Sequence, residues 1–183
     1  MKRTIAQIKI QEAFILLSRY LPFQKITIQQ VTLEAKVSRA TFYVYFKNKQ
    51  DLICAVSDYM LYHMHETAQR FYADKTFCMG IESYPALARH IHQNQDLFIE
   101  LMGPDGDLSF KEKWKDVFCL LFENRLIIEG QNKTPILQKS VELISAGLID
   151  HIIESFQKRK YLITLNTFYT AELILRSILS QAS

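Results

Sequence analysis

The sequence has few residues that stop helices or cross-link chains. Its 183 residues include only five glycines and four prolines, together with three cysteines, Cys54, Cys78 and Cys119. So few turn-forming residues favour long helices joined by short loops. An odd number of widely spaced cysteines without a C-x-x-C pair predicts neither a disulfide framework nor a metal cluster. We therefore expect a reducing compartment, the cytoplasm.

Long apolar runs are also missing. The longest, such as Leu126–Ile128 and Leu173–Leu175, are far shorter than the roughly 20 residues that cross a bilayer. Lys2 and Arg3 precede no apolar core and no small-residue cleavage site, so we expect no signal peptide and no membrane association.

Acidic residues are scarce in the first part of the chain. Residues 1–50 contain nine Lys and Arg against Glu12 and Glu34, a balance of +7, whereas residues 51–183 carry −4. A basic head on an acidic body favours a polyanionic partner for the head. A solvated basic face without a partner would give the same composition.

Hydrophobic periodicity predicts helices along the whole chain. No useful stretch alternates with a period of two residues, so we expect no sheet. The expected helices span about residues 4–20, 28–35, 39–45, 49–71, 83–93, 95–102, 109–128, 136–158 and 167–180. Gly103–Asp107 is the clearest loop, and Asn166 is the expected cap of the last helix.

Residues 27–46 have the pattern of a helix-turn-helix. Thr27 and Ser38 suit the N-caps of two short helices that a very short turn separates. Apolar residues fall where the small core needs them: Val31, Ala35, Val37, Phe42 and partly Tyr45, closed from behind by Ile10, Phe14, Leu17 and Phe23.

The second helix of such a motif enters the major groove and presents its first residues to base edges. Arg39 can reach guanine or a phosphate, Thr41 can reach a base edge, and Ala40 offers a methyl group to thymine. Donors suited to the phosphate backbone surround them: Thr27, Ser38, Tyr43, Tyr45, Lys47 and Lys49. Helix pairs of this kind also occur purely as packing units.

The segments Ile26–Ile28 and Val37–Leu52 resemble the TetR/AcrR family of regulators. They contain a Thr cap, a V-S-x-x-T-hydrophobic-Tyr segment, then Phe-Lys-Asn-Lys and an acidic-Leu pair, and the resemblance covers about residues 4–60. It implies phosphate contacts by Thr27, Tyr43, Tyr45 and Lys49, and base-proximal positions for Arg39, Ala40 and Thr41.

Three positions depart from the family pattern. Lys36 stands where glycine is common, Thr32 where a small residue is usual, and Tyr45 where histidine is usual. A left-handed conformation at Lys36 would cost a non-glycine residue about 1 kcal/mol or more.

The resemblance also implies a body that binds a small molecule and dimerises through the last two helices. Phe98–Phe110 is similar to a body subtype that includes regulators of the dihydroxyacetone-kinase activator kind. We therefore expect an all-α fold with a three-helix helix-turn-helix DNA-binding head, residues 1–60, and a helical-bundle ligand-binding and dimerisation body, residues 61–183.

A two-fold symmetric protein can read two half-sites about one helical turn apart, which gives an independent reason to expect a homodimer. Ala146 and Gly147 would allow close helix approach. The candidate surface comprises Leu143, Ile144, Ala146, Gly147, His151 and Ile152, with Phe168, Leu173, Leu175, Ile178 and Leu179 of the last helix. The same apolar stripe could instead be internal core.

Aromatic and sulfur-containing side chains provide candidates for an effector pocket: Tyr59, Tyr62, His63, Met102, Trp114, Phe118 and Phe122. At helical spacing such residues are also typical of ordinary core. The pairs His63/His65 and His90/His92 are two apart and point to different helix faces, so we expect no metal and no cofactor.

The sequence has no P-loop, no G-x-G-x-x-G, no G-x-S-x-G and no H-E-x-x-H, so we do not expect an enzyme. We expect a homodimeric repressor that binds a palindromic DNA operator and is released by an unidentified small molecule. The alternatives are a regulator that acts as an activator or through a protein partner, and a helical carrier or enzyme whose head serves packing alone.

Overall fold

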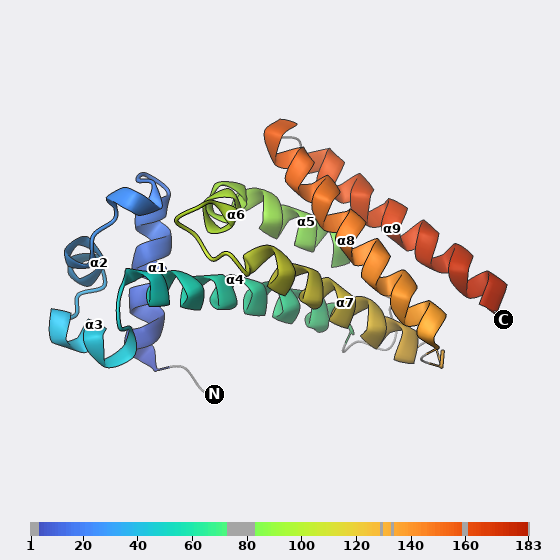
Figure 1. Cartoon of the computed structure of the whole chain (residues 1–183), viewed down its shortest axis with the longest axis horizontal. Helices are drawn as coiled ribbons and strands as arrows, with labels where there is room; N and C mark the ends of the chain where they lie inside the picture. The colour runs from blue at the N-terminus through green and yellow to red at the C-terminus, as the bar shows by residue number, and fades with distance from the viewer. Residues whose placement is uncertain (1–3, 73–82, 129, 133, 159–160, 183) are drawn as a thin grey trace. The chain divides into compact units, whose positions relative to one another are not determined.

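The computed structural model describes residues 4–72, 83–128, 130–132, 134–158 and 161–182, and these are helical with short connections (Figure 1). The elements are α1 (Ile5–Ser18), the 3-10 helix η1 (Phe23–Lys25), α2 (Ile28–Glu34), α3 (Arg39–Tyr45), α4 (Lys49–Tyr72), α5 (Ser83–Gln93), α6 (Gln95–Met102), α7 (Phe110–Ile128), α8 (Pro135–Lys158) and α9 (Tyr161–Ala182). No strand occurs in these ranges, so the expected all-α class is confirmed.

Three residues named above, Lys2, Arg3 and Cys78, lie outside the described ranges. Within those ranges, no helix combines the length and the apolar character needed to cross a membrane.

The chain divides into two compact units. The first contains Met1–Met60 and Asp96–Phe110, and the second contains Leu61–Gln95 and Lys111–Ser183. The head expected at residues 1–60 is therefore joined by most of α6 and the loop that follows it. The chain passes between the two units three times: within α4 after Met60, at the start of α6 and at the start of α7.

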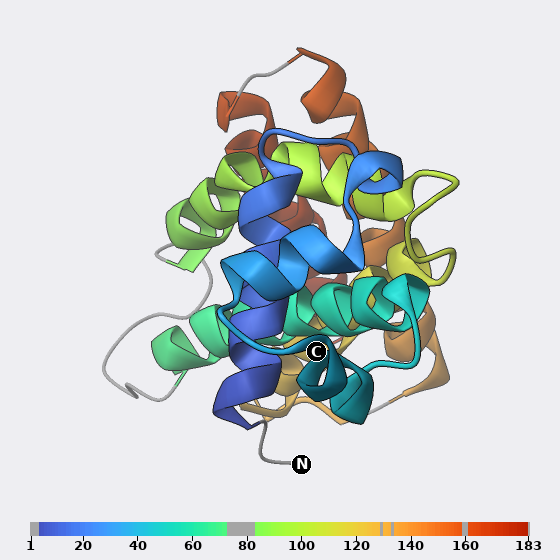
Figure 2. The same ribbon diagram turned by 90° about the vertical axis from the view of Figure 1, so that its left-hand side faces the viewer.

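The core of the first unit is formed by α1, α2 and α3 with the start of α4, which Figure 2 shows from the side where α1 crosses behind α2. The ring of Phe14 meets that of Phe23 edge-on at 4.9 Å, and Phe42 lies 5.6 Å from Phe46. The expected core residues Ile10, Phe14, Phe23, Val31, Ala35 and Phe42 are buried, while Leu17, Val37 and Tyr45 are half-buried. Burial of each large side chain contributes about 1.5–3 kcal/mol.

The loop after α6 is fixed in the first unit by buried polar contacts. Asp107 is buried, and its carboxylate accepts hydrogen bonds from the Ser57 hydroxyl at 2.6 Å and from the backbone and hydroxyl of Ser109. The Glu100 carboxylate accepts from the backbone N–H of Phe23 at 3.2 Å. The bonds from Ser57 and Phe23 link α6 and its loop to segments that precede them by 50 and 77 residues.

Gly106 is the residue that lets this loop close. A Cβ atom at this position would overlap the carbonyl oxygens of Glu100 and Leu101. The N–H of Asp107 donates to the Leu101 carbonyl at 2.8 Å, which satisfies one of the free acceptors at the end of α6. Close approach of backbone to backbone therefore explains the glycine here.

Aromatic rings fill the second unit. Trp114 is fully buried, its indole N–H points to the sulfur of Met64 at 3.3 Å, and its ring stacks on Phe156 at 6.4 Å. Phe118 lies between Trp114 and Phe168, with ring centroids at 6.2 Å and 5.7 Å.

The last helix begins earlier than the sequence predicted. We expected a start near residue 167 with Asn166 as the cap, but α9 starts at Tyr161. Asn166 lies inside the helix, where its carbonyl accepts from the Thr170 hydroxyl at 3.0 Å. A capping residue favours a helix start but does not impose one, and Tyr161–Leu165 contains no glycine or proline to stop the helix.

A buried charged network joins α5, α7 and α9. Arg125 and Glu172 form an ion pair in which both side chains are 3% exposed. Glu172 also accepts from the Tyr84 hydroxyl and from Arg176, each at 2.6 Å. Burial alone would raise the pKa of Glu172, but the hydrogen bonds from Arg125, Tyr84 and Arg176 outweigh it and hold the pKa below the usual 4.5.

We expect Glu172→Gln to lower the free energy of unfolding by about 3–5 kcal/mol at pH 7, because it leaves the Arg125 charge buried and unbalanced. The lowered pKa means that the carboxylate stabilises the fold above about pH 4.5 and loses this effect as the pH falls further. Urea unfolding from pH 7 down to pH 3 should show the two proteins converging at the acidic end.

Two further variants test whether the lost stability comes from a buried charge without its partner. Glu142→Gln removes an exposed partner of Lys139 and should leave stability unchanged. Arg125→Met combined with Glu172→Leu removes both buried charges and should recover most of the lost stability. A double variant as unstable as Glu172→Gln would contradict this account.

Candidate nucleic-acid interface

Two helix caps build the helix-turn-helix. The Thr27 hydroxyl accepts from the N–H of Gln30 at 3.2 Å, and the Gln30 side chain accepts from the N–H of Thr27 at 2.8 Å. Ser38 accepts from the N–H of Thr41 at 2.9 Å. Both caps expected from the sequence are confirmed. They satisfy donors that the first turns of α2 and α3 would otherwise leave unpaired.

The turn between α2 and α3 is left-handed at Lys36, where φ is +54°. The N–H of Val37 donates to the Thr32 carbonyl at 3.0 Å and closes the end of α2. The chain thus adopts the turn that a glycine would favour, at a cost of about 1 kcal/mol or more, and gains an exposed ammonium group near the motif.

The faces of α3 are fixed by its buried residue. Phe42 is fully buried, whereas Arg39, Ala40, Tyr43 and Val44 are exposed. Arg39 and Ala40 are therefore available to a partner, as the sequence predicted for base-proximal residues.

Thr41 and Tyr45 are half-buried on the flanks of α3. The Thr41 hydroxyl lies 2.8 Å from that of Ser38, so it takes part in the cap. Tyr43 is 50% exposed and its ring lies edge-on to Phe42 at 5.4 Å. The roles of these residues in contacting bases or phosphates stay predictions.

The two lysines after α3 have different surroundings. Lys47 has an exposed side chain, and its backbone N–H donates to Asp51 at 2.9 Å. Lys49 is half-buried, and its ammonium group donates to the carbonyls of Phe23, Gln24 and Ile26 at 2.9, 3.3 and 3.1 Å. Lys49 therefore ties the start of α4 to the η1 segment, a role that the sequence did not indicate.

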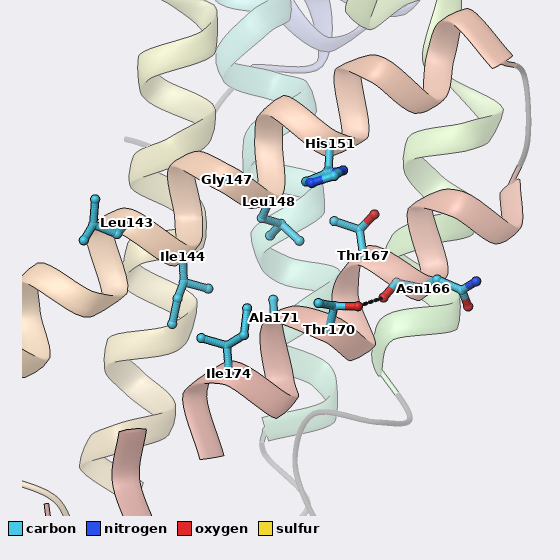
Figure 3. Close-up of a pocket in the computed structure, with 10 residues that line it drawn as sticks. All are labelled: Leu143, Ile144, Gly147, Leu148, His151, Asn166, Thr167, Thr170, Ala171 and Ile174. Atoms are coloured by element: carbon cyan, nitrogen blue, oxygen red, sulfur yellow. Dashed lines mark hydrogen bonds between the residues drawn. The ribbon is translucent and has the colours of Figure 1, made fainter. Parts of the chain in front are cut away.

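A groove lies between α8 and α9 in the second unit, with a volume of about 560 Å³. Figure 3 shows Ile144 and Leu148 of α8 facing Ala171 and Ile174 of α9 across the space between the two helices. The lining is mostly apolar and comprises Leu143, Ile144, Gly147, Leu148, His151, Asn166, Thr167, Thr170, Ala171 and Ile174.

None of the seven residues predicted for an effector pocket lines this groove. Trp114, Phe118 and Phe122 are buried, Tyr59 and Met102 are half-buried, and Tyr62 and His63 are exposed. Tyr59 and Met102 belong to the first unit and the other five to the second. Their role in binding a ligand stays a prediction.

Only some of the residues predicted to form the dimer surface are exposed. Leu143 and Leu173 are 65% and 67% exposed, and Gly147 is exposed with open space where a Cβ would stand. Four of the predicted surface residues are instead buried within the chain: Ile152, Phe168, Leu175 and Leu179. The sequence could not separate the exposed face of α9 from its buried face, because adjacent residues such as Leu173, Ile174 and Leu175 are all apolar.

Titratable residues do not gather into a metal site in the described part of the chain, where no three His, Cys, Asp or Glu lie close enough together. His90 of α5 lies near His63 of α4. Burial, and then the charge of His63, lower the pKa of His90 below 6.5, so that it is neutral at pH 7.

The surroundings of the two lysines predict different outcomes for their replacement. Lys49→Met should lower the free energy of unfolding by about 1–3 kcal/mol, because it leaves carbonyl acceptors unpaired, with little effect on the salt dependence of DNA binding. Lys47→Met should leave stability unchanged and reduce the slope of log K against log salt by about 0.9, the loss of one phosphate contact. Urea unfolding and binding to duplex DNA at several salt concentrations measure the two effects. A reduced slope without destabilisation in Lys49→Met would show that Lys49 contacts phosphate instead.

Comparisons with known proteins identify the motif. Residues 22–56 match the model of the tetR family of bacterial regulatory proteins. No curated protein sequence matches the chain.

Solved structures share the whole fold. The chain is similar to the dihydroxyacetone kinase operon activator DhaS, with 17% identity, a TM-score of 0.70 and coverage of 97% of this chain and 96% of that one. A TetR-family regulator from Syntrophomonas wolfei gives 16% identity and a TM-score of 0.64, with 97% and 94% covered. The fatty acid degradation regulator FadR from Bacillus halodurans gives 15% and 0.61, with 96% and 97% covered. The resemblance found in the sequence is thus confirmed: the chain has the DNA-binding motif and the fold of TetR-family transcriptional regulators.

Proposed function

We propose that the protein is a homodimeric repressor that binds a palindromic DNA operator and is released by a small molecule held in the body. The observation that carries the DNA-binding part is the capped α3, which exposes Arg39 and Ala40 in a basic head while Phe42 anchors the helix. Phosphate contacts by Thr27, Ser38, Tyr43, Tyr45 and Lys47 belong to the same proposal. The phosphate contact predicted for Lys49 is untested, and its three bonds to carbonyl groups favour a structural role instead. We also propose that the protein acts in the cytoplasm.

A second copy of the chain is the proposed occupant of the groove between α8 and α9. The exposed apolar side chains of the groove, Leu143 and Ile174, and the exposed Leu173 next to Ile174 in the chain, would be covered by the same residues of the partner. Self-complementary surfaces of this kind are typical of two-fold dimers.

The release step is a population shift. A ligand that binds one conformation of the second unit more tightly moves the equilibrium by its difference in affinity for the two states. Three passages of the chain link this unit to the first, which contains the helix-turn-helix. No particular ligand is assigned.

An activator is the second candidate. The similarity to an operon activator supports activation of transcription as the alternative to repression. An activator could use the same dimer and the same operator. Expression of a reporter behind the selected operator, with and without the protein, distinguishes the two signs.

Selection of binding sites from random duplex DNA at moderate salt tests the proposed function. We expect a palindrome with half-sites about one helical turn apart. A folded protein that enriches no sequence would overturn the proposal and favour a helical carrier or an enzyme.

Gly147 offers a test of the dimer. We expect Gly147→Arg to be monomeric in sedimentation analysis, because a long charged side chain would fill the groove that the second copy occupies. Gly147→Ala adds one methyl group, which is small beside the groove's volume of about 560 Å³, and should remain dimeric. Both replacements favour the helical conformation by up to about 1 kcal/mol, so loss of the dimer would not reflect unfolding. A dimeric Gly147→Arg protein would place the interface elsewhere.

A further inference from the structure

An apolar side chain stands on the outward face of α3. Val44 is 75% exposed, on the side of the helix away from the buried Phe42. Ala40, also exposed, lies four residues earlier and therefore on the same face. Folding gives no reason for a valine here, since the side chain buries little surface and a β-branched residue is a weaker helix former than alanine or lysine.

The neighbours of Val44 restrict what could cover it. Arg39, Tyr43 and Lys47 are all exposed in this short segment, so cationic and hydroxyl groups lie within a few residues of the apolar pair. Such a surface is complementary to a polyanion, and a membrane or an apolar protein surface would leave these charges without partners. In the major groove of DNA the apolar group that base edges offer is the 5-methyl of thymine.

The spacing fits base edges. Two residues four apart in a helix are separated by about 6 Å along its axis. Successive base pairs are about 3.4 Å apart, so Ala40 and Val44 could meet bases about two steps apart when α3 lies along the groove. The small side chain of Ala40 would allow the close approach that this contact needs.

We propose that Val44 is a specificity-determining residue that selects thymine at one position of each half-site through contact with the 5-methyl group. This inference rests on the proposed DNA-binding function and adds to it a residue one turn beyond the base-proximal positions that the sequence indicated.

Other exposed apolar side chains of the first unit do not share this setting. Leu33 is 79% exposed but belongs to α2, the helix that in this architecture does not read bases. Leu33→Ala is therefore a matched control, because it also shortens an exposed apolar side chain on a short helix of the same motif.

The test is a double-mutant cycle between protein and DNA. Each thymine of the selected operator is replaced in turn by deoxyuridine, which removes only the methyl group, and affinity is measured for the native protein and for Val44→Ala. For the native protein we expect a loss of about fourfold at one thymine per half-site, since the contact buries one methyl-sized group at each. For Val44→Ala the same replacement should change affinity by less than about twofold, while Leu33→Ala should retain the native response.

The outcomes separate the inference from the function beneath it. Equal losses for the native protein and Val44→Ala at every thymine, or an operator without a thymine that responds to deoxyuridine, would overturn the role of Val44 and leave the operator-binding function standing. Failure to select any sequence would overturn both. Thermal unfolding of Val44→Ala, expected to match the native protein because the side chain is exposed, ensures that altered affinity reflects contact with DNA.

Discussion

The burial of Phe42 is the constraint on which the proposed interface depends. α3 has only seven residues, and isolated helices shorter than about 12–15 residues are marginal in water. Its stability must therefore come from Phe42, which is fully buried, and from the Ser38 cap. Once Phe42 is inside, the helical period decides that Ala40 and Val44 face outward and that Thr41 and Tyr45 lie on the flanks.

The same unit uses polar groups for structure where DNA recognition could also use them. The hydroxyls of Thr27, Ser38 and Thr41 are held in caps, and the ammonium of Lys49 is held by three carbonyls. A phosphate oxygen approaching these groups would compete with bonds already made, or share a donor with them. An exposed side chain such as that of Lys47 could bind a phosphate without such competition, so it is the simpler source of affinity for a polyanion.

Local signals in the sequence predicted local structure well. The caps at Thr27 and Ser38 and the core of the helix-turn-helix depend on residues within a few positions of one another, and the structure confirms them. The association of α6 with the first unit depends instead on Glu100 meeting a backbone group 77 residues earlier, a pairing that periodicity cannot indicate. The Arg125–Glu172 pair, 47 residues apart, was missed for the same reason.

Apolar periodicity also could not divide α9 into faces. Leu173 is exposed and Leu175 is buried, although both fit the apolar stripe that suggested an interface. A helix with apolar residues around much of its circumference offers several faces with similar patterns, so only packing against a neighbour decides which is internal. Glu172 gives the missing information in retrospect, because a carboxylate in an apolar helix must find a cation, and Arg125 fixes which side of α9 turns inward.

Buried polar groups in both units favour discrete conformations over gradual deformation. Asp107 in the first unit and Glu172 in the second each accept several hydrogen bonds in buried surroundings, and a partly broken network would leave charge unsatisfied. Each network should then change as a whole, because breaking one bond leaves the others strained or unpaired. A ligand of the kind proposed above would therefore select between discrete arrangements of the second unit rather than deform it gradually.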